Sequence, residues 1–272
     1  MADFDAGDDA VHGDEPSDRA AWPRFCFVLA RTTDPCDPAA AGEAVAEIFG
    51  PEFSAEVPDP GMVAVTCGAE TIGFLALMPI PIPGGEAEVN ADGNFLWPNG
   101  REEAAAHRAH VIVTVAGGSA ESTPVESALA LSKLALVALR LFDGIGVYWG
   151  AASVCHSREF FENACDGMNE EQLPVLAWLR FQFVSDDDGS KKFYTLGMPQ
   201  FGLMDIEVDR VDGEPGEVFG FVADIAHYLL QSGPVIADGN TVGGSAEERI
   251  VVRHLPSLID PEKTVYKIRF GG

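Results

Sequence analysis

The chain has 272 residues, of which 47% are hydrophobic and 22% charged, a balance that predicts a folded protein and excludes an intrinsically disordered one. Its 17 basic and 43 acidic residues give a formal net charge of −26, which disfavours nucleic acid and anionic membrane surfaces as partners. The length lies between one large domain and two small ones, so we expect two packed subdomains.

Residues 1–22 contain seven carboxylates against a single arginine and no apolar run, so we expect a disordered acidic tail that is not a signal peptide. No apolar stretch reaches the roughly 20 residues that a membrane span needs. The five cysteines are odd in number and lack the Cys-x-x-Cys spacing, which predicts free thiols in a reducing compartment. We therefore expect a cytoplasmic protein.

The next segment, residues 23–156, is expected to form an N-terminal α+β subdomain. Asp37 is a good N-cap with Pro38 in the first helical position, and Thr123 with Glu126 makes a capping box. The order βαβββαβ follows, typical of a ferredoxin-like sheet with one added strand. The expected elements are a strand over 24–30, a helix over 38–49, strands over 62–67, 71–77 and 109–116, a helix over 123–142 and a strand over 145–149.

A long loop is expected over residues 79–107, where glycines, prolines and asparagines follow no helical or strand period. Loops of this length in a compact domain are usually either functional lids or disordered insertions. Its aromatic pair, Phe95 and Trp97, is costly to leave in water and should fold back onto the body. Trp97 then acts either as part of a lid over a pocket or as a plug at the edge of the core.

Residues 157–272 are expected to form a C-terminal α+β subdomain of order βββαββ. A short helix over 157–164 links it to the first half. The other expected elements are strands over 175–184, 192–196 and 205–208, a helix from 215 or 216 to 231, and strands over 250–254 and 265–270.

The run from Tyr194 to Val208, which begins Tyr-Thr-Leu-Gly-Met-Pro-Gln-Phe-Gly, resembles the C-terminal signature of the bacterial family catalogued as domain of unknown function 4261. Asp238-Gly-Asn-Thr-Val-Gly243 continues this resemblance, and stretches beginning at Ala106 and Gly146 are similar to the N-terminal half of the same family. The resemblance implies an α+β fold and no catalytic residues, because the family has no established activity to carry over.

Several chemistries find no support in the sequence. Gly144-Ile-Gly146 enters a strand from a helix, whereas the dinucleotide fingerprint needs a strand followed by a helix, and no Walker sequence or Gly-x-Ser-x-Gly elbow occurs. Cys155 beside His156 says nothing about the spatial pairing that activates a thiol. We therefore expect no cofactor, and the sequence leaves open whether the protein is an enzyme.

Metal binding would most plausibly use His107 and His110, with His156 as a third ligand. Two strand residues three apart point to opposite faces, so we expect no metal and single hydrogen-bonded histidines instead. If the strands that carry His110 and Trp149 are neighbours, the 79–107 loop would cover both. The candidate ligand-binding residues are Trp97, His107, His110, Trp149 and His156.

Two functions remain open. The first is a non-enzymatic binding or interaction module, of the immunity or accessory-factor kind, whose acidic surface meets a basic protein partner. The second is a small-molecule enzyme or ligand-binding protein with its pocket under the 79–107 loop.

Overall fold

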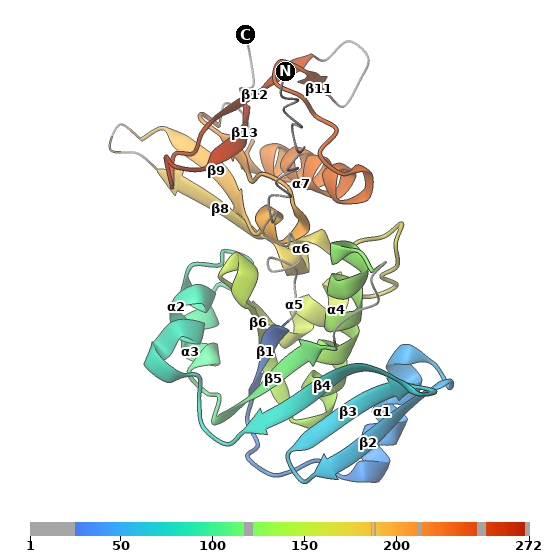
Figure 1. Ribbon diagram of the computed structural model, residues 1–272. Coiled ribbons are helices and arrows are strands. Elements are labelled where there is room, and N and C mark those ends of the chain that lie inside the picture. Colours follow the sequence, from blue (N-terminus) through green and yellow to red (C-terminus); the bar gives the residue numbers. More distant parts are fainter. Residues whose placement is uncertain are drawn as a thin grey trace, which may run out of the picture.

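The computed structural model of the protein describes residues 25–116, 122–185, 187, 189–211, 214–243 and 249–269. Within them the fold is α+β, with seven α-helices and two sheets of seven and six strands. The sheet built from the second half of the chain stands above the first in Figure 1. The acidic tail expected over residues 1–22 lies outside the described residues. No helix in the described ranges is long and apolar enough to cross a membrane.

The seven-stranded sheet has the order β2-β3-β4-β5-β1-β6-β7, and every neighbouring pair is antiparallel. Its strands are β1 (Phe25–Ala30), β2 (Phe53–Asp59), β3 (Met62–Cys67), β4 (Glu70–Met78), β5 (Ala109–Val115), β6 (Gly144–Trp149) and β7 (Val154–Ser157). β2 and β7 were not expected. Pro58 and the alternating polar residues of β2 hide its strand character, and β7 is only four residues long.

Helices α1 (Pro38–Phe49) and α4 (Pro124–Leu141) cover one face of this sheet. Both begin where the capping residues predict, because Asp37 accepts a hydrogen bond from the amide of Ala39 and Thr123 closes a capping box with Glu126. Every second residue of the central strands packs under these helices, among them Val28, Leu75 and Val111.

The 79–107 segment is not the structureless loop that we expected. It contains the short helices η2 (Pro83–Gly85), α2 (Glu86–Asp92) and α3 (Gly100–Ala104). α2 and α3 have seven and five residues, too few for a helical period to be visible in the sequence. They cover only the β6–β7 end of the second face of the sheet.

The six-stranded sheet has the order β11-β12-β13-β10-β9-β8, and α7 (Pro215–Ser232) packs on one of its faces. The pair β10–β13 is parallel and the other pairs are antiparallel. The strands are β8 (Arg180–Ser185), β9 (Lys191–Leu196), β10 (Ile206–Val208), β11 (Thr241–Val242), β12 (Ile250–Pro256) and β13 (Thr264–Ile268).

Two short helices, α5 (Arg158–Ala164) and α6 (Val175–Trp178), connect the two sheets, and η4 (Met198–Phe201), between β9 and β10, packs against α4. The strand expected over 175–184 was wrong in its first half, because the four residues of α6 turn the chain before β8 begins. Trp178 donates from Nε1 to the Ser132 hydroxyl of α4 at 2.8 Å, and its ring stacks near that of Trp149. One hydrophobic core therefore continues through both halves of the chain.

Candidate functional site

The five candidate ligand-binding residues fall on two different faces of the seven-stranded sheet. Strand β1 lies between β5 and β6, so the premise that the strands of His110 and Trp149 are neighbours was wrong. His110 faces the side of α2 and α3, where its ring lies against Phe27. Trp149 packs in the core beneath α4. The structure therefore does not gather the five side chains into one pocket.

Trp97 is 5% exposed and belongs to a small hydrophobic cluster between α2, α3 and the sheet. Its indole Nε1 donates to a carboxylate oxygen of Glu103 at 2.7 Å. A Cβ added at Gly146 would lie 3.0 Å from the Trp97 ring, so the backbone of β6 leaves room for the indole. This burial favours a plug at the edge of the core over a lid, which the stability of a Trp97 variant would decide.

His107 and His110 hold the two ends of the 79–107 segment. The amide of Ile82 donates to His107 Nε2 at 2.8 Å, and His107 Nδ1 lies 2.6 Å from the carbonyl oxygen of Ala104. His110 Nδ1 lies 2.8 Å from the carbonyl oxygen of Ile80. Both imidazoles are thus occupied by backbone groups. No group of three metal-ligating side chains occurs within the described ranges.

His156 is 1% exposed, on the edge strand β7. The Asn94 amide nitrogen donates to the carbonyl of Cys155 and lies 3.1 Å from His156 Nδ1. Because the Asn94 oxygen accepts from the amide of Leu96, the orientation of the Asn94 amide is fixed and Nδ1 must be the acceptor. Burial lowers the pKa of His156 to about 3, although the carbonyl of Ala177 opposes this shift, so the ring is neutral.

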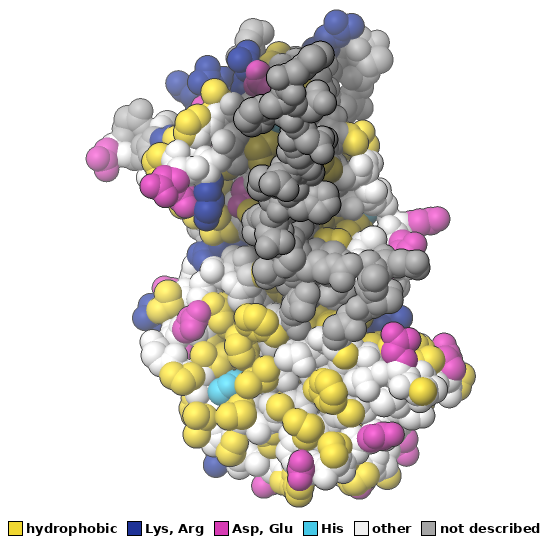
Figure 2. Space-filling model, viewed as in Figure 1, with side chains coloured by type: hydrophobic (Ala, Val, Ile, Leu, Met, Phe, Trp, Pro, Cys, Tyr) yellow, Lys and Arg dark blue, Asp and Glu magenta, His cyan; other side chains and the backbone are white. Residues whose placement is uncertain are grey.

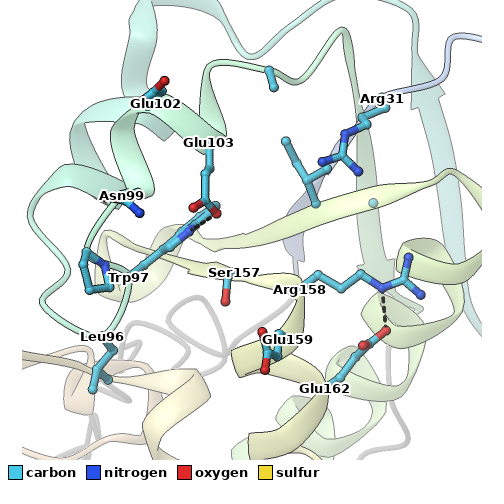
Figure 3. Close-up of a pocket in the computed structure, with 14 residues that line it drawn as sticks. Arg31, Leu96, Trp97, Asn99, Glu102, Glu103, Ser157, Arg158, Glu159 and Glu162 are labelled. Atoms are coloured by element: carbon cyan, nitrogen blue, oxygen red, sulfur yellow. Dashed lines mark hydrogen bonds and ion pairs between the residues drawn. The ribbon is translucent and has the colours of Figure 1, made fainter.

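A groove of about 990 Å³ opens beside Trp97, between the α3 segment and the start of α5 (Figure 3). Arg31 and Arg158 both line it on the side across from Trp97, and Gly144 and Ile145 of β6 are also part of its wall. Ile145 lies at the irregularity in the β1–β6 register. Of the five predicted residues, Trp97 lines this groove and the other four do not.

Carboxylates outnumber guanidinium groups in the groove. Arg158 Nε donates to Glu162 at 2.7 Å, and Glu103 receives the Trp97 indole N–H. Arg31 is held only loosely, with its guanidinium 3.9 Å from Asp143. The groove can therefore hold a polar ligand, with charged groups of both signs around it. Its acidic lining residues are Glu102, Glu103, Glu159 and Glu162.

Among the described residues, no helix packs on the second face of the seven-stranded sheet over most of β1, β5, β4, β3 and β2, and we call this the open face. Alternate residues of these strands point into the core under α1 and α4. The residues between them point to the second face, and those of the open face are not members of either buried cluster, although Phe27 packs against one. Cross-strand pairing places them side by side, as in Phe74 beside Ala64 and Phe27 beside Ile112. Figure 2 shows hydrophobic side chains gathered over this lower part of the molecule. The apolar residues of the open face are Phe25, Phe27, Met62, Ala64, Phe74, Ala76, Met78 and Ile112, and Thr114 of β5 shares the face with them.

Several large apolar side chains on this face are more exposed to solvent than is usual for such residues. Phe25 is 52% exposed, Phe74 37% and Met78 36%, and Ile80 just beyond β4 is 51% exposed. Five strands at about 4.8 Å spacing and about 20 Å length give roughly 400 Å² of sheet. This area includes the polar side chains of Ser54, Glu56 and Thr114. The largest apolar patch on a monomer covers about 300 to 600 Å² and is often functional.

Sequence reasoning missed the open face because its strands are apolar on both sides. Such strands are typical of a fully buried sheet, and nothing in Thr71-Ile-Gly-Phe-Leu-Ala-Leu77 distinguishes the covered side from the uncovered one. The shortage of charge is the one signal that the sequence carried. Strands β1 to β5, all of whose residues the structure describes, contain no lysine or arginine.

The protein is of the α+β class, with two sheets and a shared core. Residues 194–269 match the model of Domain of unknown function (DUF4261), which agrees with the resemblance seen in the sequence. This stretch runs from β9 to just past the end of β13 and contains α7. No curated protein and no solved structure matches the chain.

Proposed function

We propose that this protein is a non-enzymatic binding module that contacts another polypeptide through the open face of its seven-stranded sheet. The observation that carries this proposal is the exposure of Phe25, Phe74 and Met78 on one largely apolar sheet face, where Thr114 of β5 is the polar neighbour of both phenylalanines. Exposing such a surface to water is unfavourable by about 25 cal/mol per Å², and a partner that covers it recovers that free energy. Aromatic residues and methionine are also the side chains enriched at protein interfaces.

The test is capture by a photo-reactive amino acid placed at Phe74 in the cell of origin. We expect one polypeptide to cross-link at this position and not at Val235, an apolar residue elsewhere on the molecule that is more exposed than Phe74, at 50%. The variant Phe74→Glu should lose the partner in a pull-down, whereas Val235→Glu should keep it. Equal capture at both positions would contradict the proposal.

A second candidate function is ligand binding in the groove beside Trp97, which lies against residues 96–106 of the 79–107 segment. Arg31, 57% exposed in its side chain and only loosely paired, leaves donors free for an anionic group of a small molecule. Native mass spectrometry of the purified protein would show an added mass that disappears in Arg31→Ala. A protein that carries no added mass from its own cell would argue against this function.

We also propose how the two halves of the chain are organised. The strand order β6-β1-β5-β4 with α1 and α4 on one face supports a ferredoxin-like core in residues 23–156, extended by β2, β3 and β7. Residues 157–272 would form the second unit. Five free cysteines support a reducing, cytoplasmic compartment, and the charge of −26 supports a protein partner in place of nucleic acid or membrane.

A further inference from the structure

The partner of the open face, whose existence rests on the proposed function, has a definable chemistry. We infer that it is a polypeptide with an apolar centre flanked by lysine or arginine. The strands of the open face supply no positive charge of their own, since β1 to β5 contain no lysine or arginine. A lysine or arginine on the partner would therefore not be repelled by positive charge on these strands.

Two carboxylates lie on the open face itself, at its β2 margin. Glu56 pairs across the strands with Ala64, and Asp59 pairs with Met62, so both side chains share the face with the apolar residues. Both are exposed, and neither forms an ion pair within the described part of the chain. Unpaired carboxylates beside an apolar centre are complementary to a cation that docks with an apolar group.

The cations nearest in sequence are outside the strands. Arg31 follows the end of β1, and Arg108 precedes the start of β5, where its amide donates to the carbonyl of Ala30. Both lie at the ends of the interior strands β1 and β5, whereas Glu56 and Asp59 lie on the edge strand β2, which β3 and β4 separate from β5. The attraction for a basic partner is therefore strongest at the β2 margin.

A second copy of this chain is a poor occupant. Two copies would each carry a formal charge of −26 into the contact. In a two-fold contact the same patch meets itself, so Glu56 and Asp59 of both copies would be buried without a cation from the strands. Like charges brought together in this way oppose association. Charge complementarity thus favours a different, basic polypeptide.

The probes are two 18-residue amphipathic peptides, one made of leucine and lysine and the other of leucine and glutamate, titrated onto the full chain by fluorescence anisotropy. We expect the lysine peptide to bind at least about tenfold more tightly and to lose affinity as salt is raised. Glu56→Lys/Asp59→Lys should weaken its binding by about fivefold. The control Asp224→Lys/Glu262→Lys changes the net charge equally, at exposed positions of the other half, and should leave binding unchanged.

The outcomes separate the two proposals. If Phe74→Glu abolishes binding of both peptides while Glu56→Lys/Asp59→Lys has no effect, the apolar docking face stands and the basic partner is overturned. If Phe74→Glu has no effect, the docking face itself is overturned. If sedimentation shows that the chain dimerises and that Phe74→Glu makes it monomeric, the occupant is a second copy and the inference is wrong.

Discussion

The two sheets of this protein differ in the faces that lie away from their long helices α1, α4 and α7. The seven-stranded sheet leaves an apolar face open to water, with Glu56 and Asp59 only at its margin. The six-stranded sheet carries a row of polar side chains across five strands on the face away from α7. The row consists of Arg253, Lys267, Glu207, Tyr194 and Gln182.

The centre of this polar row is closed off by protein. Glu207 and Lys267 are 2% and 5% exposed, and they form an ion pair of 2.8 Å. Lys267 also contacts Asp209 at 2.8 Å, while Glu207 accepts from the Ser257 hydroxyl and the Leu258 amide in the β12–β13 turn. The second sheet thus completes its polar face internally, whereas the first leaves an apolar face uncovered by the described residues.

Replacing Trp97 tests whether the partly covered end of the first sheet is a plug or a lid. Trp97→Ala should lower the free energy of unfolding by about 4 kcal/mol, because a buried indole is replaced by a cavity and Glu103 loses its donor. Urea denaturation measures this loss, with the exposed Phe95→Ala as the comparison. A variant of nearly native stability with altered binding would mean that Trp97 belongs to a lid.

Breaking the ion pair tests whether the second sheet depends on its closed polar row. Lys267→Met should cost about 3 kcal/mol of unfolding free energy, because two carboxylates lose their buried cation. Lys191→Met, an exposed change in the same sheet, should stay within about 0.5 kcal/mol. In guanidinium denaturation, the double variant Glu207→Leu/Lys267→Met should recover much of the lost free energy of unfolding, because no buried carboxylate of this pair is left without its cation. If the double variant is as unstable as Lys267→Met, the pair does more than compensate charge.

Asp205, between β9 and β10 of the second sheet, should make the free energy of unfolding depend on pH. Burial raises the pKa of Asp205 to about 6, against hydrogen bonds from Met198 and Thr195 that favour the carboxylate. The folded state therefore holds the proton more tightly than the unfolded state, so this group's contribution to stability falls as pH rises from about 4 to about 6. Asp205→Asn should flatten that window in thermal melts, and an unchanged pH profile would contradict the assignment.

The smallest effect is expected from the acidic tail, which lies outside the described residues. Deleting residues 2–20 removes almost nothing apolar and should leave the melting temperature within a few degrees. Calorimetry of the truncated and full chains checks this. A large loss of stability would show that the tail contributes to one of the two faces compared here.

The sequence alone determined the elements whose causes are local. Asp37 and the Thr123–Glu126 box set the starts of α1 and α4, and β3, β5 and β6 match their apolar runs to within two residues. Capping and periodicity act over a few residues, so they can be seen without the fold. The motif from Tyr194 onward likewise pointed to the family that residues 194–269 match.

The tertiary structure alone decided the candidate sites. Whether β1 separates His110 from Trp149, and which side of β4 is covered, depends on the order of strands that are far apart in the chain. Glu207 and Lys267 lie 60 positions apart, and only the parallel β10–β13 register brings together these two among 43 acidic and 17 basic residues. Strand order and register result from burial summed over the whole core, and no local pattern of residues records that sum.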